Sequence, residues 1–449
     1  MAEMLKRAYG PGDMSGAEVR IGQAAFPAPF ASGLEFSSPA RGVWNIVHTG
    51  MLIPGAHQIY ICARGCLRGV ILTAAEMNAM ERMSWVALEE TDLFDGRLET
   101  GIEEGVAHIL RGMKRRPPCV LVFISCVQQF AGLDFPHVLG RLRAQFPETD
   151  FVDCYMNPTM RKSGPTPDQI MRRQLYAPLK RPEKRDPRAV SMIGNDLCLD
   201  PECELVRMIR ENGYDYRDIT LCRTYEEYKS LAESALLLTA IPAAVHGASI
   251  LAERLGVRHL DLTMSCSPES IESSLKLLAE ALALPEPDFR KGREQAEEAL
   301  RAAKEEIGDT PIALDYTAVP RPVSLARLLL DRGFRVNRIH ADVFLPEERN
   351  DFEYLRKTHP ELTVSAAVHA KMRFAPRFAE TGNGVLAIGQ KAAWFCGTRH
   401  FVNIVSGGGL YGYSGLVRLA GLMRDAFRNE KNTEEVIRRK GFGCESCLT

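Results

Sequence analysis

The sequence predicts an α/β protein made of three Rossmann-like units with parallel sheets. Strand-sized apolar runs alternate with helix-sized amphipathic segments along most of the chain, a pattern typical of parallel strands joined by helical crossovers. The length of 449 residues suits about three domains at roughly 150 residues each. No short-period repeat or low-complexity tract competes with this interpretation.

The first unit, 37–185, shows β-α-β order after an initial helix. An N-terminal arm at 1–36, rich in Gly, Pro, Ala and Ser, precedes it, and we expect this arm to dock on the rest of the chain or on a partner. Helices are predicted at 98–114 and 135–145, and strands at 119–124 and 150–154.

The second unit, 186–284, and the third unit, 285–440, repeat the alternation. In the second, strands are predicted at 189–194, 216–222, 235–239 and 259–264, and helices at 201–212, 225–234 and 243–255. The third opens with a long charged helix at 285–307; its strands are predicted at 311–316, 335–339, 362–366 and 384–388, and its helices at 324–331, 346–357 and 390–396. A short tail, 441–449, ends the chain.

Charge and hydropathy exclude several classes of function. The 56 Lys and Arg residues nearly balance the 57 Asp and Glu residues, giving a net charge of −1, so there is no global field that would hold nucleic acid. No apolar run is long enough to cross a membrane. The N-terminus lacks the features of a secretory signal, so we expect a cytoplasmic protein.

Thiols are kept reduced in the cytoplasm, so the 12 cysteines are better interpreted as core residues, metal ligands or redox groups than as disulfides. Cys62 and Cys66 lie beside Gly65 and Gly69, which would let backbone amides approach bound sulfurs. Cys126 follows the strand at 119–124, at the end where α/β folds place their sites. The alternative for Cys62 and Cys66 is a pair of small buried apolar residues.

Other groups offer weaker signals. The C-terminal pair Cys444 and Cys447 has the CxxC spacing of a metal or redox pair. His246 is a candidate ligand or proton donor, or else a hydrogen-bonded core histidine. Tyr411 and Tyr413 lie in a glycine-rich segment that either contacts a ligand or forms a turn. We expect the remaining thiols to be incidental or structural: Cys119, Cys154, Cys198, Cys203, Cys222, Cys266 and Cys396.

From about Glu35 to about Arg428, the sequence resembles the nitrogenase component 1 family. Ile61-Cys-Ala-Arg-Gly-Cys66 resembles the family loop that supplies one cluster thiolate, and Ser125-Cys126 resembles the segment that supplies another. The resemblance implies a component 1-like fold and an iron-sulfur cluster, either [4Fe-4S] or a larger shared cluster, with Cys66 and Cys126 as its leading ligands. Cys62 is not a cysteine in the usual family motif, and we expect it to join them as a third cluster ligand.

The chain also departs from the family pattern. The earlier ligand cysteine is absent around 38–42, so Cys62 or a partner subunit would replace it. At the two positions that hold the nitrogenase cofactor, the chain has Ala240 and a segment from Phe401 to Gly415 that contains no histidine. We therefore expect no molybdenum-iron cofactor in the usual site and no reduction of dinitrogen.

The resemblance implies a subunit of a nitrogenase-like oxidoreductase. An ATP-dependent iron protein would deliver low-potential electrons under anaerobic conditions, and the chain would pair with itself or with a homologous component 1 subunit, as a dimer or tetramer. A small molecule that the sequence does not identify would be reduced. The alternatives are a cofactor-assembly scaffold of the same family and a cluster-free α/β protein that binds a small ligand.

Overall fold

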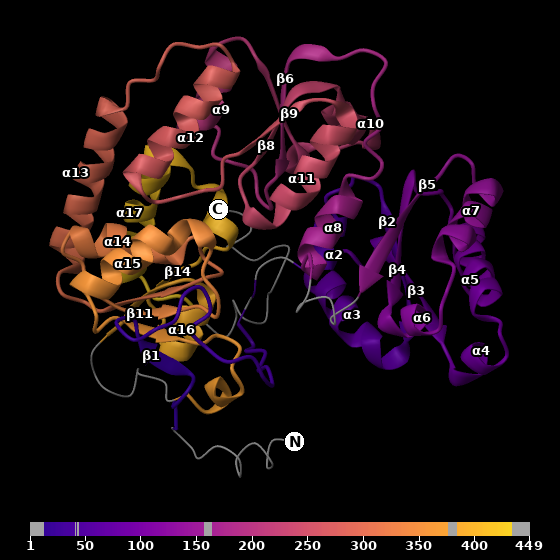
Figure 1. The fold of residues 1–449 in the computed structure, drawn as a ribbon, viewed down its shortest axis with the longest axis horizontal. Helices are drawn as coiled ribbons and strands as arrows, with labels where there is room; N and C mark the ends of the chain where they lie inside the picture. Colours follow the sequence, from indigo (N-terminus) through magenta and orange to yellow (C-terminus); the bar gives the residue numbers. More distant parts are fainter. Residues whose placement is uncertain (1–12, 41, 43–44, 157–163, 376–383, 433–449) are drawn as a thin grey trace. The chain divides into compact units, whose positions relative to one another are not determined.

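Three β-sheets organise the computed structural model, which describes residues 13–40, 42, 45–156, 164–375 and 384–432 (Figure 1). Contact density divides the chain into two compact units. One unit comprises Trp44–Cys198 and Ile209–Leu262 and contains both four-stranded sheets; the other comprises Met1–Val43, Leu199–Met208 and Thr263–Thr449 and contains the six-stranded sheet. The first two sheets thus share one compact unit, and residues 199–208 and 263–284 belong to the unit of the third sheet.

The first sheet is parallel throughout, in the order β3-β2-β4-β5. Its strands are β2 (His57–Ala63), β3 (Met83–Leu88), β4 (Cys119–Ser125) and β5 (Asp150–Met156). The helices along this stretch are α2 (Ile46–Gly50), α3 (Leu67–Glu76), α4 (Glu90–Phe94), α5 (Leu98–Gly112), α6 (Cys126–Phe130) and α7 (Phe135–Gln145). Every residue of β4 is buried, as expected for a central parallel strand covered on both faces.

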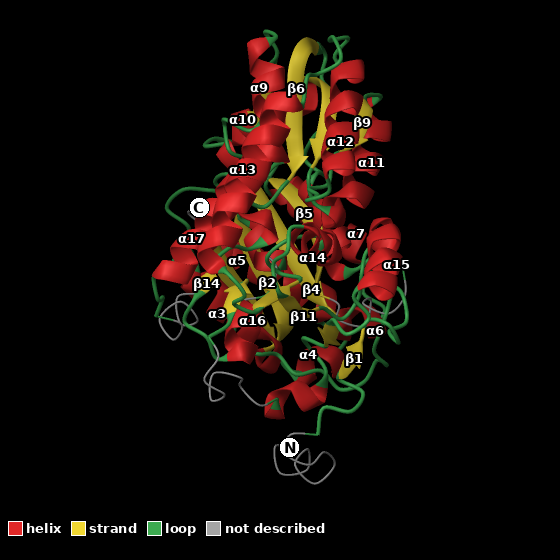
Figure 2. Ribbon diagram, turned by 90° about the vertical axis from the view of Figure 1, so that its left-hand side faces the viewer, coloured by secondary structure: helices red, strands yellow, loops and turns green. Residues whose placement is uncertain are grey.

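The second sheet is also parallel, in the order β7-β6-β8-β9. Its strands are β6 (Asp186–Gly194), β7 (Asp215–Asp218), β8 (Ser234–Thr239) and β9 (Arg258–Asp261). The associated helices are α8 (Pro167–Leu175), α9 (Glu204–Glu211), α10 (Tyr225–Ser230) and α11 (Pro242–Leu255). Helix α11 packs along β6, β8 and β9 (Figure 2).

The third sheet has the order β1-β12-β11-β10-β13-β14 and is parallel except for β1. Its strands are β1 (Glu18–Arg20), β10 (Ile312–Asp315), β11 (Val336–His340), β12 (Thr363–Ser365), β13 (Leu386–Ile388) and β14 (Phe401–Val402). The helices are α12 (Pro268–Ala281), α13 (Arg290–Ile307), α14 (Pro322–Asp331), α15 (Arg349–Thr358), α16 (Gln390–Cys396) and α17 (Gly412–Arg428).

The N-terminal arm docks on its own chain. Its strand β1 pairs antiparallel with β12, so that Val19 lies opposite Val364. Lys371 donates hydrogen bonds to Asp13 at 2.7 Å and to the main-chain carbonyl of Ser15 at 2.7 Å. The arm therefore adds an edge strand to the third sheet, which its irregular composition did not predict.

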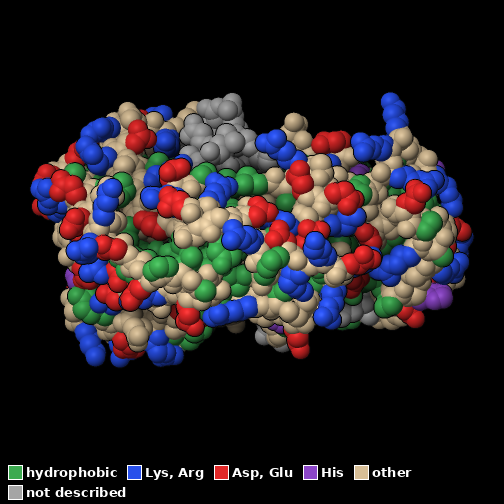
Figure 3. Space-filling view, turned by 90° about the horizontal axis from the view of Figure 1, so that it is seen from above, with side chains coloured by type: hydrophobic (Ala, Val, Ile, Leu, Met, Phe, Trp, Pro, Cys, Tyr) green, Lys and Arg blue, Asp and Glu red, His purple; other side chains and the backbone are tan. Residues whose placement is uncertain are grey.

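The predicted fold class is confirmed: three sheets, each with consecutive parallel strands connected by helices. Among the described residues, no helix is long and apolar enough to cross a membrane. Lys and Arg side chains are interspersed with Asp and Glu on the face shown in Figure 3, as expected from a net charge of −1.

Candidate functional site

The cysteines predicted as cluster ligands lie at the carboxyl end of the first sheet. Cys62 belongs to β2, Cys66 ends the short 3-10 helix Arg64–Cys66, and Cys126 begins α6 directly after β4. Strands β2 and β4 are neighbours, with Ile61 opposite Ile124, and paired strands lie about 4.8 Å apart. The segments that carry Cys66 and Cys126 therefore leave the sheet at adjacent positions.

The three thiols differ in exposure. Cys66 is exposed and Cys126 is partly exposed, whereas Cys62 is buried in the hydrophobic core that contains Tyr60 and Phe123. Burial, together with the neighbouring Cys66, raises the pKa of the Cys62 thiol to about 12. Because metals bind the thiolate and not the thiol, Cys66 and Cys126 are the better donors of the set.

The described residues contain no group of three or more His, Cys, Asp and Glu side chains that could hold a metal ion. Cys62, Cys66 and Cys126 are therefore not brought together as a three-ligand site. A [4Fe-4S] cluster takes four thiolates, so the two accessible thiols of one chain fit half of its ligand set. A Cβ built on Gly65 would meet no atom within 4 Å, which leaves the backbone beside Cys66 open to a bound group.

A buried glutamine that the sequence reasoning missed connects these two segments. The side chain of Gln128, on α6, donates to the main-chain carbonyl of Ile61 at 2.5 Å and accepts from the hydroxyl of Ser125 at 2.6 Å. Gln128 is fully buried. The available signal was the spacing of Ser125 and Gln128, because a Gln three residues after a Ser at a helix start often accepts from the backbone N–H of that Ser.

His246 lies on α11 and is partly exposed. No hydrogen bond to its ring occurs among the described residues. Ala240, which the sequence resemblance matches to a cofactor-ligand position, is buried after β8 and donates its backbone N–H to the carbonyl of Gly194 at 2.8 Å. His246 lies on a helix of the second sheet, whereas Cys66 and Cys126 follow strands of the first sheet. The histidine and the cysteines therefore belong to different sheets of the same compact unit.

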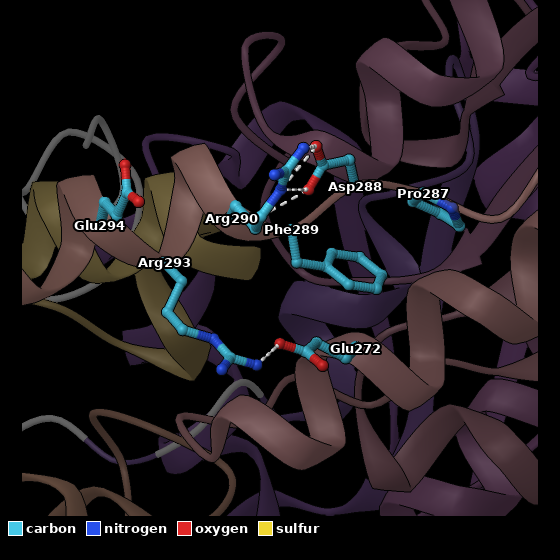
Figure 4. A pocket seen from close by; sticks show the side chains of 7 residues that line it. All are labelled: Glu272, Pro287, Asp288, Phe289, Arg290, Arg293 and Glu294. Atoms are coloured by element: carbon cyan, nitrogen blue, oxygen red, sulfur yellow. Dashed lines mark hydrogen bonds and ion pairs between the residues drawn. The ribbon is translucent and has the colours of Figure 1, made fainter.

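Tyr411 and Tyr413 lie in the other compact unit and are both buried. The Tyr413 hydroxyl donates to Glu272 at 2.6 Å, and Arg293 forms an ion pair with the same carboxylate (Figure 4). Burial and the bond to Glu272 raise the pKa of Tyr413 to about 12. The Tyr413 hydroxyl therefore links α17 to α12, and through the Arg293 ion pair to α13. It already has a hydrogen-bond partner within the chain, the Glu272 carboxylate.

The glycine-rich segment before α17 is held by a second carboxylate. Glu204 accepts from the backbone N–H of Ser414 at 2.9 Å and from its hydroxyl at 2.8 Å. A Cβ on Gly412, whose φ is +69°, would meet this carboxylate. Glycine is therefore required at this position by the packing of Glu204 within the chain. This favours the prediction that the segment forms a turn over the prediction that it contacts a ligand.

The remaining cysteines divide as follows. Cys119, Cys154, Cys203, Cys266 and Cys396 are buried, Cys222 is partly buried and Cys198 is exposed. Burial raises the pKa of the Cys119 thiol to about 12, in keeping with a core position. Cys444 and Cys447 lie outside the described residues.

Parallel α/β sheets with accessible cysteines after two adjacent strands define the class of protein to be identified, and comparison with known proteins shows its family. Residues 47–375 match the family model described as nitrogenase component 1 type oxidoreductase. This match covers more than half of the chain, so the chain belongs to that family.

Solved structures agree on the fold. The chain is similar to a nitrogenase Cp1 structure at pH 6.5, with a TM-score of 0.65 and 15% identity, covering 89% of this chain and 94% of the other. It is also similar to nitrogenase Cp1 at pH 5, with a TM-score of 0.61 and 13% identity, covering 92% and 94%. No curated protein matches the sequence. At such low identity the structural likeness supports the fold alone.

Proposed function

We propose that this chain is a subunit of a nitrogenase-like reductase that holds an iron-sulfur cluster through Cys66 and Cys126. The observation that carries the proposal is the placement of these two accessible thiols after adjacent parallel strands. When bound, the cluster would supply single-electron transfer. Cys62, the predicted replacement for the missing family cysteine, would have to leave the core to take part.

A partner subunit would complete the ligand set. Two thiols from each of two chains make the four that a [4Fe-4S] cluster requires, so a second copy or a homologous subunit fits. Phe130, which ends α6, is 82% exposed, and Phe94, which ends α4 after β3, is 85% exposed. Large exposed aromatic side chains at the same edge of the sheet favour a protein–protein contact there.

The electron donor would be an ATP-dependent iron protein, and the acceptor a small molecule other than dinitrogen. Support for excluding dinitrogen comes from the chain itself: Ala240 stands where a cofactor cysteine is expected, and no histidine lies between Phe401 and Gly415. The Gly407–Gly412 segment is packed against Glu204 and Met264 instead. We therefore expect iron without stoichiometric molybdenum.

The test begins with anaerobic purification and measurement of iron and sulfide. Wild-type protein should contain an iron-sulfur cluster, and Cys66→Ala and Cys126→Ala should each lose most of the iron. Cys198→Ala, which removes an exposed thiol elsewhere, is the matched control and should retain it. A colourless, iron-free wild type, or equal iron in all three variants, contradicts the cluster and favours a cluster-free binding protein.

Turnover separates a reductase from an assembly scaffold. With its iron protein, ATP and a reductant, the reductase should pass electrons to an added acceptor in a reaction that depends on Cys66 and Cys126. Hydrolysis of ATP with no electron transfer to any acceptor tested would favour the scaffold. Stoichiometric molybdenum would show that the argument from the missing cofactor ligands is wrong.

A further inference from the structure

A pocket lies at the opposite edge of the first sheet from the cysteines. It has a volume of about 1060 Å³ and is bounded by the residues that precede β2, β4 and β5 and by the start of α10. All amino ends of parallel strands meet at one edge and all carboxyl ends at the other. This basic pocket is therefore separate from the Cys66 and Cys126 segments and plays no part in the proposed cluster site.

Positive side chains dominate the pocket. Lys114, Arg115 and Arg116 follow the end of α5, Arg223 precedes α10, and Arg82 directly precedes β3. The carboxylates are Glu81, Glu148 and Glu226, and Glu226 is paired with Lys229 at 2.8 Å. Within the described part of the chain, no carboxylate forms an ion pair with Lys114, Arg115 or Arg223. These three cations are thus available to an anion from solution.

At the rear of the pocket, Arg82 and His57 already form hydrogen bonds within the protein. The Arg82 guanidinium donates to the main-chain carbonyls of Ile53 at 2.6 Å, Ala56 at 3.1 Å and Met51 at 3.2 Å, so these bonds hold its positive charge at the rear of the pocket and use three of its N–H donors. His57 bonds Ser84 at 2.8 Å. Burial and the charge of Arg82 lower the pKa of His57 to about 4, so this histidine is neutral at pH 7 and the positive charge of the pocket belongs to Lys and Arg.

The other walls are apolar and aromatic. Pro54, Met113, Pro117 and Pro118 line the pocket beside Tyr225, whose hydroxyl is fixed by a bond to Asp150 at 2.7 Å. A concave, partly apolar hollow of this size suits a small molecule more than a flat protein surface. Guanidinium groups match phosphate oxygens in a planar, two-bond geometry.

We propose that the basic pocket binds a small molecule that carries two or more phosphate groups on an organic ring system, of the nucleotide class. Arg115, Arg223 and Lys114 would contact the phosphates, and the proline and tyrosine wall would contact the ring. This site goes beyond the proposed function, since it needs neither the cluster nor an iron protein.

The experiment measures binding to the whole purified chain by titration calorimetry at low salt, with no iron protein present. Pyrophosphate, ATP and adenosine are the probes. ATP should bind more tightly than pyrophosphate because it also uses the apolar wall, adenosine should bind far more weakly than ATP, and added salt should weaken ATP binding. Arg115→Glu and Arg223→Glu should each weaken ATP binding by about tenfold or more, as expected for the loss of one charged phosphate contact.

Lys357→Glu, the same change of charge on an exposed residue of α15 in the other compact unit, is the control and should leave ATP binding unchanged. Circular dichroism checks that the variants fold, and Arg115→Ala provides a milder second variant. Failure of both ATP and pyrophosphate to bind, or equal binding by all variants, overturns the proposal. Binding of a polyglutamate peptide but not of pyrophosphate overturns it in favour of an acidic protein segment.

Discussion

The side-chain amide of Gln128 donates a hydrogen bond of 2.5 Å to the main-chain carbonyl of Ile61, which joins α6 to the end of β2. The amide oxygen accepts from the backbone N–H of Ser125 at 2.9 Å. Because Gln128 is fully buried, water cannot readily replace these partners. One residue therefore fixes the segment of Cys126 relative to the strand that leads to Cys66.

Gln128→Leu should lower the free energy of unfolding by about 3 kcal/mol, because a buried carbonyl, a buried N–H and a buried hydroxyl lose their partner. Chemical denaturation measures this change. Gln23→Leu, at an exposed position of the arm, is the control and should change stability by less than about 0.5 kcal/mol. Equal stability of the two variants would show that the Gln128 bonds contribute nothing.

Thiol labelling should follow exposure. In iron-free protein, iodoacetamide should modify Cys66, Cys126 and Cys198 in the native state, since these thiols are exposed or partly exposed. Cys62 and Cys119 should react only after unfolding, because burial raises the pKa of each to about 12. Peptide mass spectrometry identifies the modified residues. Native labelling of Cys62 as fast as Cys66 would place its side chain outside the core.

Two glycines of α17 should respond in opposite directions to alanine. Gly412→Ala should destabilise the protein by about 3 kcal/mol, because a side chain is strained at positive φ and would displace Glu204 from Ser414. Gly421→Ala should stabilise it by up to about 1 kcal/mol, since a Cβ there meets nothing within 4 Å. Thermal or chemical unfolding checks both, and destabilisation by Gly421→Ala would contradict the helix argument.

Glu348 should make stability depend on pH. It is buried and accepts from the backbone N–H groups of Val323 and Leu345, and burial raises its pKa from 4.5 to about 7. Between these values the native state binds one more proton than the unfolded state, so stability falls as pH rises.

Relative to Glu348→Gln, the wild type should lose about 2–3 kcal/mol of unfolding free energy between pH 4.5 and pH 7. Urea titrations at several pH values measure the difference between the two proteins. A difference that is constant across this range would show that the Glu348 carboxyl has the same pKa in the native and unfolded states.

The strands that the sequence predicted are mostly those with continuous apolar runs, such as β4 and β8. Strand β2 was missed because Gln58 interrupts its apolar pattern, yet this residue is buried and satisfied by bonds to the Val47 carbonyl at 3.0 Å and from the Tyr60 hydroxyl at 2.7 Å. Strand β1 is three residues long and exists only because β12 offers a free edge. The strand propensity of the local sequence predicts neither the buried partners of Gln58 nor the free edge of β12.

For the candidate site, the sequence by itself determined the resemblance to the family and the position of Cys126 after a buried strand, because both depend on residue type and spacing. The lack of both nitrogenase cofactor ligands stays a prediction from the same resemblance. Only the tertiary structure decided that Cys62 packs in the core while Cys66 is exposed, and that Gln128 joins the two cysteine segments. It also showed that Glu272 accepts a hydrogen bond from the Tyr413 hydroxyl and that Glu204 accepts one from the backbone of Ser414, beside Gly412. The physical reason is that burial, hydrogen-bond partners and pKa depend on residues brought together from distant parts of the chain.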